Sequence, residues 1–258
     1  MARAPRVKTL AVIPARLGAR RLPRKPLRLL AGLPLVLRVW QRVESMHLAE
    51  RCVIATDSDE VAEAVRPHGA EVLITSAEHP SGTDRVAEVA ARREFRDYDA
   101  IVNVQGDEPF VAASAVRGAV SQITSGNFPL GTAAARASDD ILEEPSVVKV
   151  VAADDGRAMY FSRAAIPFLR DAADAQLRTT RVWQHIGVYA YAREALARWV
   201  SLPPHPLERI ERLEQLRPLA AGMAMGVALV TEPPHIGIDT AADLSRANAD
   251  WNDFEERH

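Results

Sequence analysis

The chain has 258 residues, of which 48% are hydrophobic and 26% charged, and its formal net charge is −2. This composition supplies a sizeable core and excludes an intrinsically disordered chain. The balance of 32 basic and 34 acidic side chains argues against a protein whose main ligand is nucleic acid.

The single cysteine, Cys52, excludes an intrachain disulfide and a zinc cluster built from several cysteines. It sits in an apolar run, where we expect it to be buried, and its use fits a reducing cytoplasm. No apolar segment has the length of a signal peptide core or a membrane span. We therefore expect a cytoplasmic protein that does not insert into a membrane.

The first half of the chain alternates strands and helices. Apolar runs predict strands at 8–13, 52–56, 71–75 and 100–104. Periodic patterns and capping residues predict helices at 34–46, 57–65 and 84–95. Strands separated by helices of this length imply right-handed crossovers and a mostly parallel sheet with helices on both faces.

The pattern changes after about Gly126, where strand-like runs crowd together at 147–152, 158–162 and 185–191. They suggest antiparallel strands at the sheet edge, or a small excursion used for dimer contact. Further predictions are a polar loop or short helix at 170–181, a helix at 207–219, a strand at 224–230 and a last helix opened by a capping box at Thr240. We expect a single domain spanning 1–258, with an inserted subregion at about 127–200.

A cationic loop, defined here as residues 16–25, follows the first predicted strand in the segment VIPARLGARRLPRKPL. Its five cations are Arg16, Arg20, Arg21, Arg24 and Lys25. Ligands of open α/β sheets bind at the carboxyl ends of strands, and this density of charge suits a triphosphate better than a neutral ligand. The alternative is a solvated basic loop.

A carboxylate follows the predicted strand at 100–104, in the sequence Gln105-Gly106-Asp107. Gly106 permits a tight turn that presents Asp107 at the same sheet edge as the cationic loop. A carboxylate beside a triphosphate is suited to hold Mg²⁺, which takes one or two carboxylates together with phosphate oxygens. The alternative is that Asp107 caps a helix near 109–120.

A second carboxylate, Asp239, also follows an apolar stretch and precedes a helix. Because Thr240 can cap that helix itself, Asp239 is free for another task. Asp107 and Asp239 are candidates to share one Mg²⁺, although spacing along the chain does not test this.

Three weaker signals remain. Ser81 and Gly82 enter a predicted helix, where backbone donors can bind a base or a phosphate, or where Ser81 is an ordinary N-cap. His185 and Tyr189 fall on one or neighbouring faces of a strand, where a histidine is more often a core or surface residue than a ligand. Four polar residues have helical spacing, which usually marks a solvated face: Glu208, Glu211, Glu214 and Gln215.

Taken together and in order, the motifs resemble one family. They are VIPARLGARRLPRKPL, HPSGTDRVAEV, NVQGDEP, VKVV, YFSRAAIP, HIGVYAY, PLERIERLEQLR and GIDTAADL. The chain resembles the 3-deoxy-manno-octulosonate (KDO) cytidylyltransferases, also called CMP-KDO synthetases, over residues 10–248.

The resemblance implies a three-layer α/β fold of the nucleotide-diphospho-sugar transferase (glycosyltransferase-A-like) type, with a mostly parallel sheet and a small antiparallel dimerisation subregion. It also implies a homodimer and a Mg²⁺-dependent transfer of CMP from CTP to the anomeric hydroxyl of KDO. Pyrophosphate is the other product, and the activated sugar feeds lipopolysaccharide biosynthesis.

The resemblance also assigns roles to residues of this chain. The catalytic group is Lys25, Arg21, Asp107 and Asp239, of which Asp107 and Asp239 hold Mg²⁺. Nucleotide binding falls to Arg16, Arg21, Lys25, Ser81, Gly82, Gln105 and Asp107. Contacts to the acidic sugar fall to Arg85, Gln105, Arg163, His185, Tyr189, Glu214 and Gln215, with Arg163 the first candidate for the sugar carboxylate.

The cationic loop departs from the family pattern at three positions. Ala19 stands where a small hydroxyl residue is usual, Arg20 where threonine is common, and Arg24 where glycine is usual. The alternatives are therefore a KDO analogue such as an amino sugar, another acidic acceptor, or a catalytically silent relative. Retention of Lys25 with Asp107 and Asp239 argues against a silent relative.

Overall fold

A computed structural model describes residues 7–18, 21–137, 141–232 and 237–256. The chain divides into two compact units, the first formed by residues 1–113 and 235–258 and the second by residues 114–234. The inserted subregion predicted at about 127–200 lies within the second unit. None of the helices in the described stretches combines the length and apolar character needed to cross a membrane.

The sheet of the first unit contains four parallel strands in the order β6, β1, β4, β5. Their bounds are β1 (Thr9–Ala15), β4 (Arg51–Thr56), β5 (Glu71–Ile74) and β6 (Ala100–Asn103). β1 and β4 are buried almost throughout, as expected for strands of a parallel sheet covered on both faces. All four strands are predicted correctly, with ends that differ by one or two residues.

Three helices connect these strands: α1 (Leu35–Ser45), α2 (Asp59–Val65) and α3 (Gly82–Ala91). The chain runs outward from β1 through β4 to β5 and then returns to the other side of β1 as β6. Because such crossovers are right-handed, this reversal puts α3 on the opposite face of the sheet from α1 and α2. The carboxyl ends of β1 and β6 therefore meet at a topological switch point, where α/β sheets bind ligands.

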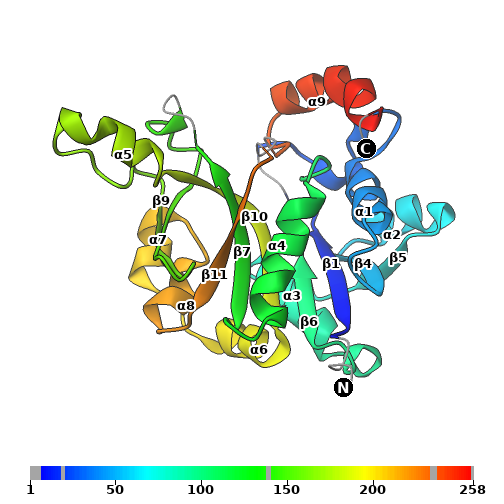
Figure 1. The fold of residues 1–258 in the computed structure, drawn as a ribbon. Coiled ribbons are helices and arrows are strands. Elements are labelled where there is room, and N and C mark those ends of the chain that lie inside the picture. Colours follow the sequence, from blue (N-terminus) through cyan, green and yellow to red (C-terminus); the bar gives the residue numbers. More distant parts are fainter. Residues whose placement is uncertain (1–6, 19–20, 138–140, 233–236, 257–258) are drawn as a thin grey trace, which may run out of the picture. The chain divides into compact units, whose positions relative to one another are not determined.

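The last helix, α9 (Ala241–Glu255, red in Figure 1), belongs to the first unit. Its buried side chains join a cluster made of Leu22, Leu30, Leu35, Phe110, Ile238, Ala247, Trp251 and Phe254. Asn248 accepts a hydrogen bond of 2.9 Å from the backbone of Ala31, between the short strands β2 (Leu29–Leu30) and β3 (Leu33–Pro34). This cluster anchors the segment that carries Asp239 beside the end of the cationic loop.

Among its described residues, the second unit contains a parallel strand pair and three antiparallel pairs. β7 (Leu130–Arg136) runs parallel to β11 (Met225–Val230) and antiparallel to β10 (Trp183–Ala192). β8 (Lys149–Ala152) is antiparallel to both β10 and β9 (Ala158–Ser162). The antiparallel addition predicted from the crowded strand-like runs is confirmed, and with it the predicted α/β class.

The second unit also contains five helices among its described residues. Their bounds are α4 (Ala113–Thr124), α5 (Ala175–Thr179), α6 (Arg193–Ser201), α7 (Pro206–Glu211) and α8 (Leu216–Ala220). The prediction of one continuous helix at 207–219 is wrong, because α7 stops at Glu211 and Arg212 takes a left-handed conformation with φ 55°. Glu208 is also not on a solvated face, since its carboxylate binds Arg217 through two hydrogen bonds of 2.5 and 2.8 Å.

Candidate active site

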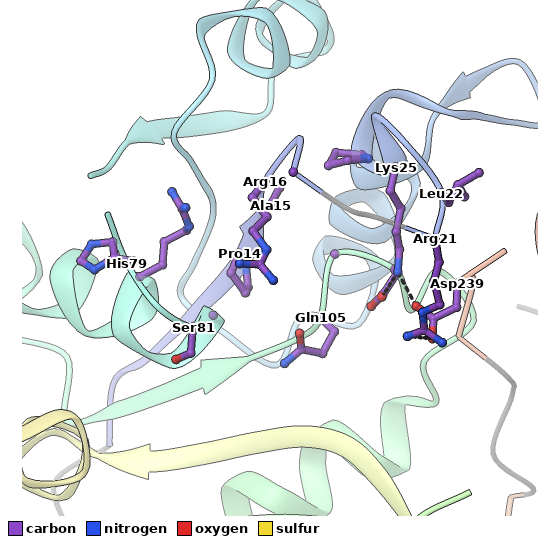
Figure 2. Close-up of a pocket in the computed structure, with 16 residues that line it drawn as sticks. Pro14, Ala15, Arg16, Arg21, Leu22, Lys25, His79, Ser81, Gln105 and Asp239 are labelled. Carbon is purple, nitrogen blue, oxygen red and sulfur yellow. Dashed lines mark hydrogen bonds and ion pairs between the residues drawn. The ribbon is translucent and has the colours of Figure 1, made fainter. Parts of the chain in front are cut away.

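A pocket of about 650 Å³ opens at the carboxyl ends of β1 and β6 in the first unit. Five segments line it: the end of β1, the cationic loop, the start of α3, the turn after β6 and the segment before α9 (Figure 2). The predicted site residues that it brings together are Arg16, Arg21, Lys25, Ser81, Gly82, Arg85, Gln105, Asp107 and Asp239.

The charges of this pocket converge on Lys25. Its ammonium donates hydrogen bonds to the carboxylates of Asp107 and Asp239, the latter at 2.7 Å, while Arg21 lies 2.8 Å from the other oxygen of Asp239 (Figure 2). Burial alone would lower the pKa of Lys25, but the two carboxylates outweigh it and raise that pKa above its ordinary value. Lys25 is therefore a permanent cation, with 14% of its side chain exposed.

The turn after β6 delivers Gln105 and Asp107 into the pocket. A Cβ atom on Gly106 would lie 2.8 Å from the carbonyl oxygen of Pro14, so only glycine lets this turn pass the end of β1. The next helix, α4, begins six residues after Asp107, at Ala113. The alternative that Asp107 caps that helix is therefore wrong.

Asp239 is released from capping, as predicted. Thr240 is the N-cap of α9, and the carboxylate of Asp243 accepts hydrogen bonds from the backbone of Asp239 and Thr240 at 3.1 and 2.8 Å. The backbone N–H of Ile238 donates to the carbonyl of Asp107 at 3.0 Å. These contacts fix the backbone on either side of Asp239 and aim its carboxylate at Lys25 and Arg21.

Glu108, which follows Asp107, is a further acidic residue beside the pocket that the sequence analysis did not predict. Its carboxyl packs against the backbone of Gly237, where a Cβ atom would lie 2.7 Å from Oε1. Removal from water, together with the negative charges of Asp107 and Asp239, raises its pKa to about 8 against the opposing effect of Lys25. Its place directly after Asp107 is the sequence signal that points to it.

The opposite end of the pocket is built by the segment that enters α3. Ser81 is the N-cap of α3, accepting from the backbone of Asp84 at 3.2 Å, so the capping alternative is correct and Ser81 also lines the pocket. Arg85 is only 3% exposed, and its guanidinium donates to Thr75 and lies 3.2 Å from Asp57. His79 lines this end too, although only the motif HPSGTDR drew attention to its neighbourhood.

The other predicted sugar contacts lie in the second unit. Arg163 donates from Nε to the carbonyl of Glu211 and from Nη1 to that of Pro145, both at 2.9 Å, so two of its donors hold the local backbone. Glu214 and Gln215 lie between α7 and α8, where Gln215 is only 3% exposed.

His185 and Tyr189 are neighbours on β10, with ring centroids 5.4 Å apart. His185 contacts the hydroxyl of Thr132 at 2.9 Å, and burial lowers its pKa to about 3, so its ring is neutral. Burial also raises the pKa of Tyr189 well above its ordinary value. The sugar-binding roles of these second-unit residues stay predictions.

Of the three positions at which the cationic loop departs from the family pattern, the structure describes one. Ala19 and Arg20 lie outside the described residues. Arg24 adopts φ 58°, the left-handed region that favours glycine, and its guanidinium pairs with Glu60. It is not among the pocket-lining residues, so its charge is directed at α2 rather than at the site.

Comparison with known proteins places the chain in a family. A family model described as cytidylyltransferase matches residues 10–225. The 3-deoxy-manno-octulosonate cytidylyltransferase of Gemmatimonas aurantiaca is 64% identical over 243 residues, which cover 94% of each chain. The 3-deoxy-manno-octulosonate cytidylyltransferase 2 of Actinobacillus pleuropneumoniae is 40% identical over 245 residues, covering 93% of this chain and 97% of that one.

A solved structure of CMP:2-keto-3-deoxy-manno-octonic acid synthetase complexed with CTP matches with a TM-score of 0.87 at 36% identity. The match covers 95% of this chain and 99% of that chain. The parallel sheet, the pocket at its switch point and these similarities lead to one conclusion: the chain belongs to the cytidylyltransferase family, among the 3-deoxy-manno-octulosonate cytidylyltransferases.

Proposed function

We propose that this chain transfers CMP from CTP to the anomeric hydroxyl of KDO and releases pyrophosphate. Its family membership makes it a nucleotidyltransferase. The observation that carries the proposal is the convergence of Lys25, Asp107 and Asp239 in one pocket at the sheet switch point. An excess of cations beside paired carboxylates suits a nucleoside triphosphate.

The reaction needs in-line attack by the sugar hydroxyl on the α-phosphorus. One P–O bond forms to the sugar oxygen, and the bond to the pyrophosphate oxygen breaks with its electron pair. Lys25, Arg21 and Arg16 supply fixed positive charge for the negative charge that develops on the leaving group. Most of the acceleration then comes from positioning and electrostatics, so no dedicated histidine base is required.

We also propose that Asp107 and Asp239 hold Mg²⁺. Both carboxylates flank one position in the pocket, which the ammonium of Lys25 occupies, so a cation is stabilised there. Within the described residues no group of three or more histidine, cysteine or acidic side chains gathers as a metal site. Two carboxylates suit Mg²⁺, which takes its remaining ligands from phosphate oxygens and water. Mg²⁺ held by these two carboxylates would supply charge neutralisation and would make the attacking hydroxyl more acidic.

A homodimer in the cytoplasm completes the proposal. The second unit exposes large apolar side chains, with Phe168 at 84% and Ile210 at 77% exposure. An interface with a second copy would remove these side chains from water. The single cysteine, Cys52, is buried and free, which fits a reducing compartment.

The acceptor is tested by measuring pyrophosphate release from CTP with Mg²⁺ and three acids: KDO, its 8-amino analogue and sialic acid. We expect KDO to give the highest kcat/KM. Faster turnover of the 8-amino analogue would replace KDO by an amino sugar as the substrate. Calorimetry that detects no CTP binding in the presence of Mg²⁺ would contradict the proposal altogether.

A further inference from the structure

A hydrogen-bonded histidine lies in the pocket and has no role in the reaction as described above. His79 precedes α3, lines the pocket and is 20% exposed at its side chain. Its Nε2 atom lies 2.6 Å from Oε2 of Glu88, which is on α3. The same carboxylate oxygen accepts a hydrogen bond of 2.8 Å from the backbone of Ser76. The ring of His79 is therefore fixed by a partner on the neighbouring helix.

The partner also fixes where the proton of His79 resides. Glu88 is held as a carboxylate, since its hydrogen bonds to Arg92, Ser76 and His79 outweigh the effect of burial and lower its pKa to about 2. A carboxylate only accepts hydrogen bonds, so Nε2 must be the protonated nitrogen. In the neutral ring Nδ1 then carries a lone pair and is an acceptor.

His79 lies at the end of the pocket away from the cluster of Lys25 and Asp239. Figure 2 shows Lys25, Arg21 and Asp239 together at one end and His79 with Ser81 at the other. In the proposed function the triphosphate occupies the charged end, so the base of the nucleotide extends toward His79. Arg85, one helical turn beyond Ser81, supplies a buried cationic donor to the wall of the same pocket.

The two pyrimidine nucleotides differ in the edge that they would present there. Cytosine carries an amino group at position 4, a donor, and acceptors at N3 and O2. Uracil carries a carbonyl at position 4 and a proton on N3, so its pattern is reversed at both positions. An acceptor at Nδ1 can accept a hydrogen bond from the amino group of cytosine. Opposite the carbonyl of uracil, two acceptors would face each other with no hydrogen between them.

We propose that His79 is a specificity-determining residue whose Nδ1 accepts a hydrogen bond from the 4-amino group of cytosine, and that Glu88 is the positioning residue that selects this tautomer. The inference rests on the proposed function for the orientation of the nucleotide. On this inference, the hydrogen-bonded pair of Glu88 and His79 makes the pocket bind CTP more tightly than UTP.

The first test is the tautomer itself. Nitrogen-15 NMR at a pH where the imidazole rings are neutral shows which ring nitrogen carries the proton. The signals of His79 are identified by their absence from the spectrum of His79→Phe. We expect protonated Nε2 and unprotonated Nδ1. A ring protonated mainly at Nδ1 would overturn the proposal.

The second test compares calorimetric affinities for CTP and UTP in the presence of Mg²⁺ and without an acceptor sugar. His79→Phe keeps an aromatic ring but has no acceptor, so we expect its preference for CTP over UTP to fall by about tenfold or more. Glu88→Ala removes the partner and is expected to reduce the preference in the same direction. Equal losses for both nucleotides, with an unchanged ratio, would show that His79 only packs against the ligand.

Glu78→Ala is the matched control. Glu78 is an exposed acidic residue next to His79 in the sequence and does not line the pocket, so we expect its variant to keep the CTP preference of the parent chain. A preference that falls as far in Glu78→Ala as in Glu88→Ala would contradict the role of the His79 contact.

Binding separates this inference from the proposed function. A chain that binds CTP with preference but releases no pyrophosphate with KDO refutes the proposed acceptor and leaves the His79 test intact. Turnover with KDO together with an unchanged ratio in His79→Phe refutes the inference alone. Failure to bind CTP at all refutes both.

Discussion

Replacement of Lys25 should affect catalysis more than folding. Its ammonium contacts Asp107 and Asp239 in the pocket, and a cation at this position stabilises the departing pyrophosphate. We expect Lys25→Met to lower kcat/KM by a factor of about 10² or more, measured by pyrophosphate release. Arg28→Met is the control, because Arg28 is an exposed cation nearby that does not line the pocket. A Lys25→Met enzyme within tenfold of the parent would contradict this role.

Glu108 should make stability depend on pH. The carboxyl has a pKa of about 8 in the folded chain against 4.5 as its ordinary value, so the folded state binds its proton more tightly. The stability that it contributes is present below pH 4.5 and is lost as the pH rises through 8. In metal-free buffer we expect this loss, about 1 to 4 kcal/mol in the free energy of unfolding, to disappear in Glu108→Gln.

Urea unfolding between pH 5 and 9, with a chelator present, measures that difference. The parent chain and Glu108→Gln should diverge as the pH rises, with the variant becoming the more stable of the two at high pH. Parallel pH profiles would show that Glu108 titrates as an ordinary carboxyl.

Local sequence signals find residues but not the contacts between them. Asp107 and Asp239 stand out because each follows an apolar stretch, and Lys25 stands out because it belongs to the cationic loop. Their meeting point joins residues 82 and 214 positions apart, which no local pattern encodes. His79 and Glu108 escaped notice for the same reason, since each owes its importance to a partner brought close only by the fold.

At the scale of elements, the turn after β6 depends on the missing side chain of Gly106. A methyl group there would lie 2.8 Å from the carbonyl oxygen of Pro14. We expect Gly106→Ala to cost about 1 to 3 kcal/mol in the free energy of unfolding, because the turn must shift. That shift displaces Asp107, so kcat/KM should fall by about tenfold or more.

Gly18→Ala is the steric control for this variant. A Cβ atom on Gly18 has no heavy atom within 4 Å and the residue needs no positive φ, so its free energy of unfolding should match that of the parent chain. Thermal or urea unfolding of the two variants makes the comparison. A Gly106→Ala chain as stable and active as the parent would refute the close approach.

Elements with strong apolar runs were predictable, and elements without them were not. β4 and β6 are built mainly from buried apolar residues and stand where the pattern predicts them. β7, with the sequence LGTAAAR, was missed because alanine and glycine have low β propensity and its place between β10 and β11 is a tertiary effect. α6 was missed as well, and the break at Arg212 depends on a left-handed residue that is not glycine.

At the scale of the whole molecule, the proposed homodimer gives a direct expectation in solution. Light scattering coupled to size-exclusion chromatography should give twice the 28.2 kDa mass of one chain. Phe168 and Ile210 are the exposed apolar residues of the second unit whose replacement by glutamate should shift the mass toward one chain, because buried charge disfavours an apolar interface. Leu29→Glu, in the first unit, should remain dimeric. A parent chain that elutes with the mass of a monomer would contradict the proposal.

The order of motifs along the whole chain carried more of the function than any single motif. The cationic loop alone indicates a polyanion at a strand end, whereas Asp107 and Asp239 in the same pocket make it one half of a site for a nucleoside triphosphate. The division into two compact units, by contrast, follows from tertiary contacts. No linker or shift in composition marks it in the sequence.

Phosphorus-31 NMR of CTP mixed with KDO, Mg²⁺ and the protein follows the proposed transfer of CMP directly. We expect loss of the triphosphate signals and equal appearance of pyrophosphate and a CMP-sugar phosphodiester. We also expect Asp107→Asn and Asp239→Asn each to slow this conversion by a factor of about 10² or more. Conversion at the parent rate in Asp107→Asn would contradict the proposed metal site. Unchanged CTP in the presence of KDO and the parent protein would contradict the proposed function itself.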